Sequence, residues 1–90
     1  MKKQVHVIYE GGVQGVGFRF TCQRIAEEFD ITGWIRNMPE GNVELAAEGE
    51  ETDLHKFLAG IKENMARYIS RDKIEWKAFQ GEFKGFDIRF

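Results

Sequence analysis

Segments in which hydrophobic and polar residues alternate are separated along this chain by two stretches in which hydrophobic residues recur with a helical period. Residues 4–10 are rich in β-branched and aromatic types and end at a glycine cluster, which predicts a strand. Val5, Val7 and Tyr9 would share one face of it. The next stretch predicts a helix of about three turns that ends near Asp30, a residue type that tolerates the left-handed conformation. The apolar face of this helix consists of Phe18, Cys22, Ile25, Ala26 and Phe29.

The middle of the chain predicts a hairpin followed by a second helix. Residues 31–38 and 42–49 flank Met38-Pro39-Glu40-Gly41, where proline suits the second position of a β-turn and glycine the fourth. Thr52 or Asp53 can then cap a helix. We expect this helix to end at about Met65. Its apolar face consists of Leu54, Phe57, Leu58, Ile61 and Met65.

Two more alternating segments follow, on either side of a turn near Gly81. Their apolar residues are Ile74, Trp76, Ala78, Phe86, Ile88 and Phe90. The resulting order is strand, helix, strand, strand, helix, strand, strand. This order is typical of an α+β protein, a ferredoxin-like split βαβ sandwich, with one extra C-terminal strand. We therefore expect residues 1–90 to form a single domain, with two helices on one face of a mixed sheet of four to five strands.

This order of elements brings two distant segments together. The first two strands are parallel in such a fold, joined by a right-handed crossover, and the third strand lies between them. The C-terminal ends of the first two strands, at Tyr9-Glu10 and at Asn37, therefore share one edge of the sheet, about 10 Å apart. Side chains and a small ligand can fill that gap.

The segment Gly11-Gly12-Val13-Gln14-Gly15-Val16-Gly17 concentrates glycines between the first strand and the first helix. Glycines let the backbone approach a ligand, and such a loop before a helix N-terminus directs several N–H groups at one point. Arg19 follows in the first helical turn, where the helix dipole disfavours a cation unless an anion is bound. Its planar guanidinium suits a phosphate or a carboxylate, and phosphate is the better hypothesis.

Other interpretations of this loop remain open or fit less well. A solvated Arg19 on a glycine-rich turn is an equally simple account of the loop alone. The sequence has no Gly-Lys-Ser/Thr, and Gly15-Val16-Gly17-Phe18-Arg19-Phe20 lacks the third glycine of the dinucleotide fingerprint. Neither ATP hydrolysis nor NAD binding follows from it.

Charge disfavours nucleic acid as a partner. The chain has 13 Lys and Arg against 15 Asp and Glu, a formal net charge of −2. An RNA-recognition domain shares the order of elements, but its aromatic residues belong on the third strand, and residues 42–48 contain none. A second alternative is a ferredoxin-like module that binds a phosphorylated metabolite without hydrolysing it, which would need Arg19 but not Asn37.

The remaining reactive residues predict no further chemistry. The single Cys22 cannot form an internal disulfide, and its position on the apolar face of a helix indicates a buried thiol. His6 and His55 lie on different elements with no partners at ligand spacing, so we expect no metal. The chain has no apolar run of the length of a membrane span and no signal peptide at Met1-Lys2-Lys3, so we expect a cytoplasmic protein without membrane contact. Nothing in the sequence requires more than a monomer.

The glycine loop and two later segments together resemble the acylphosphatases. The three segments are Gly11-Gly12-Val13-Gln14-Gly15-Val16-Gly17-Phe18-Arg19, Gly33-Trp34-Ile35-Arg36-Asn37 and Gly41-Asn42-Val43-Glu44. The resemblance extends from end to end of the chain, and each segment falls where the family has it in a ferredoxin-like order. Phe20 distinguishes the chain from the related domain of hydrogenase-maturation carbamoyltransferases, which tends to have proline there, so a free-standing acylphosphatase is the closer match.

The resemblance implies an enzyme that hydrolyses the carboxyl–phosphate bond of acyl phosphates without a metal or other cofactor. Its partners would be a small-molecule acyl phosphate and inorganic phosphate, the latter as product and inhibitor. Asn37 would orient the attacking water. The phosphoryl group would be bound by the backbone N–H groups of the loop and by the Arg19 side chain, at Gln14, Gly15, Val16, Gly17, Phe18 and Arg19.

The sequence departs from the family at two positions near this site. Gly12 stands where a basic or polar residue is usual, and Met38 stands where Thr or Leu often follows the asparagine. These departures bear on substrate preference more than on the chemistry.

Overall fold

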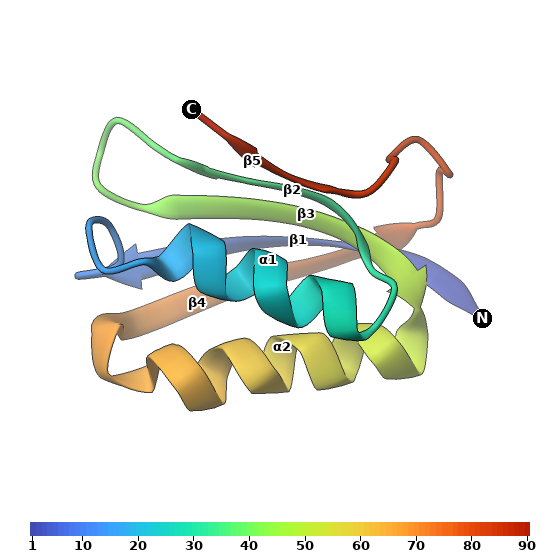
Figure 1. Cartoon of the computed structure of the whole chain (residues 1–90), viewed down its shortest axis with the longest axis horizontal. Helices are drawn as coiled ribbons and strands as arrows, with labels where there is room; N and C mark the ends of the chain where they lie inside the picture. The colour runs from blue at the N-terminus through green and yellow to red at the C-terminus, as the bar shows by residue number, and fades with distance from the viewer.

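The computed structural model describes residues 1–90 as one mixed sheet with two helices (Figure 1). The elements in chain order are β1 (Lys2–Gly11), α1 (Phe18–Glu28), β2 (Thr32–Asn37), β3 (Val43–Glu50), α2 (Glu51–Met65), the short 3-10 helix η1 (Ala66–Tyr68), β4 (Ile69–Ala78) and β5 (Phe86–Arg89). The predicted α+β, ferredoxin-like order with an extra C-terminal strand is confirmed.

The sheet has five strands in the order β4-β1-β3-β2-β5. Because β3 pairs antiparallel with both β1 and β2, those two strands run parallel, as expected. Tyr9 and Asn37 are both opposite Val43, so the ends of β1 and β2 meet at one end of the sheet.

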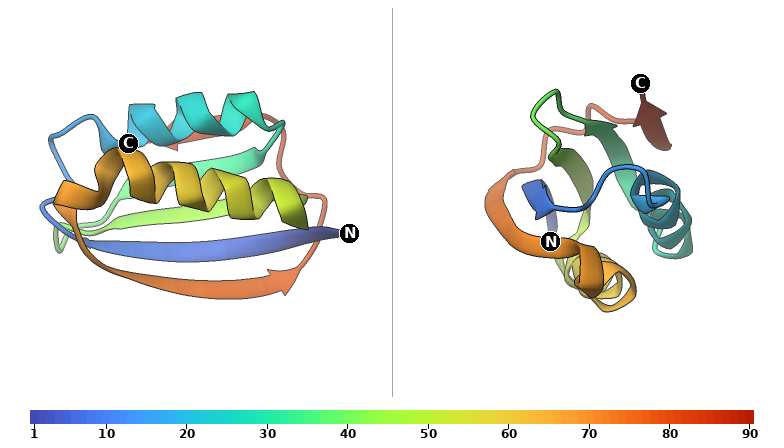
Figure 2. Two further views of the ribbon diagram at one scale, coloured as in Figure 1. Left: turned by 90° about the horizontal axis from the view of Figure 1, so that it is seen from below. Right: turned by 90° about the vertical axis from the view of Figure 1, so that its left-hand side faces the viewer.

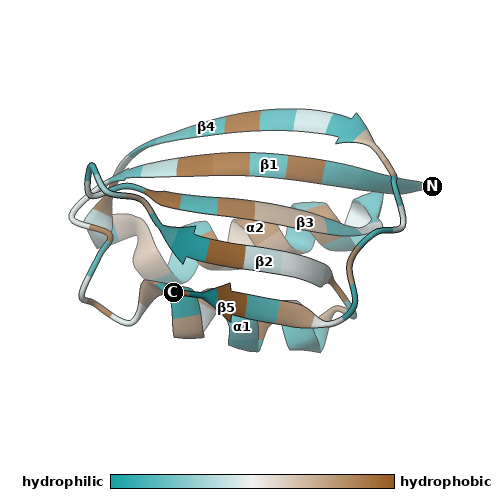
Figure 3. Cartoon of the chain, turned by 90° about the horizontal axis from the view of Figure 1, so that it is seen from above, coloured by the Kyte–Doolittle hydropathy of each residue, from teal (hydrophilic) through white to brown (hydrophobic).

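The last two strands do not form a hairpin with each other. β4 pairs with β1 at one edge, whereas β5 pairs in parallel with β2 at the other edge. Figure 3, which views the sheet with the helices behind it, shows both edge strands and the segment 79–85 that joins them across the end of the sheet. The predicted turn near Gly81 was wrong, because residues 79–84 form no turn and Gly81, with a φ of +68°, lies within this crossing segment.

Both helices pack on the same face of the sheet (Figure 2), as the sequence predicts. Val5, Val7 and Tyr9 of β1 face them, and all three are buried. Most residues of the two predicted helix faces join the same core, whose helical members are Phe18, Cys22, Ile25, Ala26, Leu54, Phe57, Ile61 and Met65. Phe29 and Leu58 pack against this core in partly buried positions. Neither α1 nor α2 has the length and apolar character that a membrane-spanning helix requires.

The predicted turn at residues 38–41 and the predicted conformation of Asp30 agree with the structure, but the predicted cap of α2 was wrong. The N–H of Gly41 donates to the carbonyl of Met38 at 3.0 Å, which closes the expected β-turn, and Asp30 has the expected left-handed φ of +55°. By contrast, α2 is preceded directly by Glu50, and no side chain caps it. Because β3 continues into α2 without a loop, Thr52 and Asp53 already lie in its first turn.

The core position of Phe57 predicts a large effect on stability. Phe57 is fully buried, with its ring 5.8 Å from that of Phe86. We expect Phe57→Ala to lower the free energy of unfolding by about 3 to 5 kcal/mol, because it removes buried apolar surface and leaves a cavity. Urea titration measures this loss, and Lys56→Ala on the exposed side of α2 is the control. A loss no larger than that of the control would contradict the packing described above.

Candidate functional site

The glycine loop and the turn between β2 and β3 lie at the same end of the sheet (Figures 1 and 2). The loop, residues 12–17, leaves the C-terminal end of β1 and leads into α1, while Asn37 is the last residue of β2. The shared edge expected from the order of elements is therefore present.

A pocket of about 220 Å³, called here the phosphate pocket, opens between these segments. Its lining residues are Val13, Gly15, Gly17, Phe18, Arg19, Phe20 and Asn37. Five of the residues named from the sequence line it together, namely Gly15, Gly17, Phe18, Arg19 and Asn37. No carboxylate lines this pocket, and the first turn of α1 contains no acidic residue, so neither the lining residues nor this turn repel an anion.

The backbone of the loop offers a continuous series of free hydrogen-bond donors. None of the N–H groups of residues 12–20 donates a hydrogen bond within the chain, and α1 has no side-chain cap. Gly15 and Gly17 have φ values of +77° and +76°, which side chains other than glycine adopt only with strain. Free N–H groups at a helix N-terminus form a site for an anion.

Gln14 and Val16, the other two residues named from the sequence, do not line the pocket. The Nε2 atom of Gln14 donates to the carbonyl oxygens of Met38 and Asn42, both at 2.8 Å. This side chain thus ties the glycine loop to the turn that follows Asn37. Val16 lies at the surface of the loop.

The side chain of Arg19 reaches the C-terminal strand. Its Nη1 atom donates to the carbonyl oxygen of Arg89 at 3.2 Å, and its guanidinium carbon lies 4.8 Å from the centre of the Phe90 ring. Arg19 takes part in none of the ion pairs of the chain, and no carboxylate lies within 4.0 Å of its guanidinium. The charge of Arg19 is therefore free to bind an external anion.

The Asn37 side chain makes no hydrogen bond within the chain, although its backbone is held in the ladder opposite Val43. Its amide can therefore both donate to and accept from a ligand or a water molecule in the phosphate pocket.

The groups beneath the pocket are apolar or protonated. Tyr9 packs on Phe18 with the ring centres 5.0 Å apart, and burial raises the pKa of its hydroxyl well above the ordinary value. Burial likewise raises the pKa of the Cys22 thiol, in agreement with the predicted buried, unreactive cysteine.

Sequence reasoning did not assign Val13, Phe20 or the C-terminal residues to the site. Phe20 lies off the apolar face of α1, and an aromatic residue on the polar side of a helix is a signal that points to exposure near a ligand. Arg89 and Phe90 gave no such signal, because their contact with Arg19 depends on where β5 joins the sheet.

A larger pocket of about 370 Å³ lies at the opposite end of the strands and is called here the carboxylate pocket. Its lining residues are Lys2, Phe29, Asp30, Thr32, Glu48, Gly49, Glu50, Asp53, Phe79, Gly81 and Phe83. Despite its size it does not suit a phosphate, because its carboxylates would repel one. The smaller pocket beside Arg19 is therefore the candidate anion site.

Comparison with known proteins finds relatives that match along nearly the whole chain. The family model described as acylphosphatase matches residues 5–88. The acylphosphatase of Geobacillus thermodenitrificans is 42% identical over 89 residues, 98% of this chain and 95% of that protein. The acylphosphatase of Methylococcus capsulatus is 42% identical over 88 residues, 96% of this chain and 95% of that protein.

Among solved structures, the crystal structure of acylphosphatase from Bacillus subtilis superposes with a TM-score of 0.89 at 29% identity. The superposition covers 100% of both chains.

The bridge formed by Gln14 predicts a positioning effect on anion binding. We expect Gln14→Ala to weaken binding of inorganic phosphate by about 3- to 30-fold, because two hydrogen bonds that hold the glycine loop against the turn are lost. Calorimetric titration with phosphate measures the change. Gln23→Ala is the matched control, since Gln23 also donates to a backbone carbonyl, that of Phe86 at 3.0 Å. Equal phosphate affinity in both variants would show that the bridge does not position the loop.

Proposed function

This chain belongs to the acylphosphatase family and is an enzyme that hydrolyses acyl phosphates, and we propose that its glycine loop and Arg19 bind the phosphoryl group while Asn37 orients the attacking water. The observation that supports these roles most directly is the run of free N–H groups over residues 12–20, with Arg19 and Asn37 lining the same pocket. The N–H groups of Gln14, Gly15, Val16, Gly17 and Phe18 are the proposed backbone donors.

The proposed site suits phosphoryl transfer. A loose transition state places charge on the equatorial phosphoryl oxygens, so catalysis depends mainly on positioning and on preorganised positive groups. Backbone N–H groups and a guanidinium supply these without rearrangement during the reaction. The guanidinium of Arg19 would exchange its single contact to the Arg89 carbonyl for charge-assisted, bidentate contacts to the phosphoryl oxygens, which are stronger.

The leaving group explains why a pocket without an acid is sufficient. Hydrolysis releases a carboxylate, and the pKa of its conjugate acid is about 4, so it departs without being protonated. A covalent nucleophile is not required either, and the only cysteine in the chain is buried in the core. The Asn37 amide would accept from and donate to one water molecule in line with the bond that breaks. The proton of this water would pass to a phosphoryl oxygen of the substrate.

The rim of the pocket suits an apolar acyl group. Phe20 lines the pocket and is 62% exposed, an unusual fraction for a phenylalanine. With the phosphoryl group against the loop, the acyl group would extend outwards and pack on this ring. Small-molecule acyl phosphates with apolar acyl groups are therefore the proposed substrates, and inorganic phosphate is the proposed product and inhibitor. A monomeric state, a single domain over residues 1–90 and a location in the cytoplasm stay predictions from the sequence.

The two proposed roles predict different kinetic effects. We expect Arg19→Ala to lower kcat/KM for benzoyl phosphate by about 10²- to 10³-fold and to weaken inorganic phosphate binding, because a charged donor to the phosphoryl group is lost. We expect Asn37→Ala to lower kcat with little change in phosphate affinity. Steady-state assays with a chelator present, together with phosphate calorimetry, measure both.

The exposed Arg24 and Asn64 provide matched controls, since both lie outside the phosphate pocket. Activity that persists in Arg19→Ala and Asn37→Ala at the level of Arg24→Ala and Asn64→Ala would overturn both roles. Phosphate binding by Arg19 without any turnover in the unaltered protein would favour a metabolite-binding module instead.

Phe20 predicts a change in substrate preference. We expect Phe20→Ala to lower kcat/KM for benzoyl phosphate about 5- to 30-fold, but to leave that for acetyl phosphate nearly unchanged, because only the larger acyl group loses apolar contact. The measured quantity is the ratio of the two kcat/KM values. Phe79→Ala, which removes an exposed ring outside the phosphate pocket, is the control. A ratio unaffected by Phe20→Ala would exclude this contact.

A further inference from the structure

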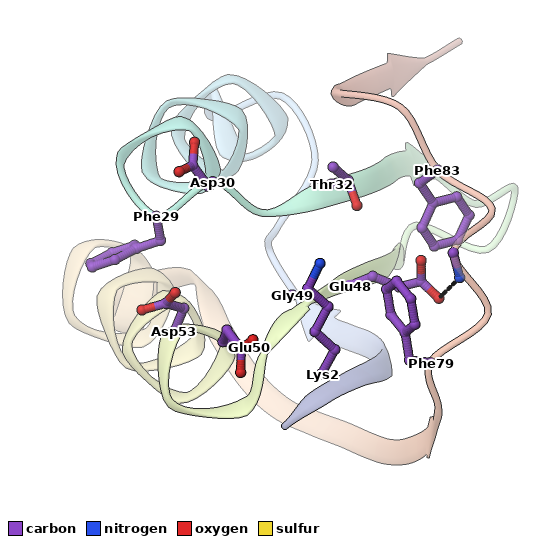
Figure 4. Close-up of a pocket in the computed structure, with 11 residues that line it drawn as sticks. Lys2, Phe29, Asp30, Thr32, Glu48, Gly49, Glu50, Asp53, Phe79 and Phe83 are labelled. Atoms are coloured by element: carbon purple, nitrogen blue, oxygen red, sulfur yellow. Dashed lines mark hydrogen bonds between the residues drawn. The ribbon is translucent and has the colours of Figure 1, made fainter.

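The carboxylate pocket lies at the opposite end of the sheet from the phosphate pocket. Thr32, which begins β2, lines the former, and Asn37, which ends the same strand, lines the latter. No residue lines both pockets. Figure 4 shows the carboxylate pocket with side chains from the helix ends, the sheet and the segment 79–85. The proposed acyl phosphate chemistry gives no role to this pocket.

Glu48 is the buried acid of this pocket, with only 1% of its surface exposed. Its Oε2 atom accepts hydrogen bonds from Gln4 Nε2 at 2.9 Å, from the N–H of Gln80 at 2.7 Å and from the N–H of Gly81 at 3.3 Å. Its Oε1 atom is buried and has no partner, the one such side-chain atom in the chain. A buried carboxylate oxygen without a donor is costly, so the site favours a ligand that supplies one.

Most carboxylates of the pocket have no positively charged partner. Glu50 pairs with the N-terminal ammonium of Met1 at 2.9 Å. Asp30, Glu48 and Asp53 have no cation within 4.0 Å, since none of the ion pairs in the chain includes them. The dipole of α2 stabilises the Asp53 carboxylate in the first turn of that helix. Asp30 lies beyond the C-terminus of α1, where the helix dipole disfavours an acid. The pocket therefore has an excess of negative charge.

Aromatic rings complete the pocket and already receive an ammonium group. In the view of Figure 4 the Glu48 carboxylate lies between the rings of Phe79 and Phe83. The Nζ atom of Lys2 lies 5.4 Å from the centre of the Phe79 ring, a cation–π contact. Carboxylates next to aromatic faces are the surroundings that an alkylammonium ion favours, and the contact of Lys2 with Phe79 shows that the aromatic part of these surroundings accepts an ammonium group.

From this arrangement we propose that the carboxylate pocket binds an aliphatic amine that carries two or more ammonium groups. One ammonium group lies between the rings and donates to Oε1 of Glu48. The alkyl chain passes over the end of the sheet at Thr32 and Gly49, and a second ammonium group pairs with Asp30 or Asp53 on the side of the helices. A pocket of about 370 Å³ is within the usual range for a small ligand.

The same contacts favour an ammonium ion over other cations. A guanidinium binds a carboxylate best through two parallel hydrogen bonds, but Oε2 of Glu48 already accepts three, and only Oε1 is free. A metal ion needs several ligands around one point, and no three His, Cys, Asp or Glu side chains in the chain are close enough to provide them. Separated carboxylates instead suit a ligand whose charges are spread along a chain.

Calorimetric titration of the protein with spermidine tests this proposal. We expect saturable binding with one site per chain. Glu48→Gln should weaken it about tenfold or more, because the amide oxygen keeps the three donors on that side while the amide nitrogen replaces the free acceptor with a donor. Asp30→Asn should also weaken binding, and asparagine keeps the left-handed conformation available at this position.

Glu63→Gln is the matched control, because it removes the same charge from an exposed position of α2 outside both pockets. Equal weakening in Glu63→Gln and Glu48→Gln, or the absence of saturable binding, would overturn the proposal, since either result indicates only general attraction of cations. Circular dichroism shows whether Glu48→Gln folds. If it does not, the spermidine affinities of Asp30→Asn and Glu63→Gln are compared instead, and equal affinities overturn the proposal. We expect hydrolysis of benzoyl phosphate to be unchanged in all three variants, so the outcome does not depend on the roles of Arg19 and Asn37.

Discussion

The antiparallel pairing of β3 with both β1 and β2 is the constraint on which the phosphate pocket depends. With Val43 opposite both Tyr9 and Asn37, the ladder places the end of β1, and hence the glycine loop, beside the end of β2. The buried side chains of β1 and β3 face the helices, so a shift of register by one residue would turn these core residues towards solvent. The hydrophobic core therefore maintains the geometry of a pocket that is itself polar. Gln14 reinforces this arrangement from within the loop, because it spans from the loop to the carbonyl groups on either side of the turn after β2.

The polar groups of the phosphate pocket come mainly from the backbone rather than from titratable side chains. The N–H groups of residues 12–20 are free, and Arg19 and Asn37 are the two polar side chains that line the pocket. Such a site needs little from burial or from shifted pKa values, because its charge and its donors are present at any ordinary pH. The groups whose pKa is raised by burial, Tyr9 and Cys22, lie in the core beneath it. Tyr9 and Cys22 therefore contribute to packing. A site without a titratable acid is sufficient here because the leaving group of the reaction departs without being protonated.

The two ends of the sheet have opposite chemistry. At one end, Arg19 lines a pocket without carboxylates beside a loop whose N–H groups are free, whereas at the other end Glu48, Asp30 and Asp53 lack cationic partners. The segment 79–85 forms part of the carboxylate pocket, because it crosses from β4 to β5 and two of its backbone N–H groups donate hydrogen bonds to Glu48. Without this crossing, Glu48 would be a solvated residue on the open face of β3. The extra C-terminal strand thus affects both ends, since β5 also brings the Arg89 carbonyl to Arg19.

Much of this molecule follows from its sequence, because the relevant signals are local. Alternation and helical spacing predict the strands and both helix faces, and the glycines before Arg19 predict an anion site at a helix N-terminus. Parallel first and second strands then place Asn37 near that site. The tertiary structure alone decided which edge each of the last two strands joins, that Gln14 holds the loop to the next turn, and that Glu48 is buried with one oxygen unpartnered. These features depend on contacts between residues that are tens of positions apart. The free energy of such contacts is set by packing and desolvation in three dimensions, which no local pattern of residues records.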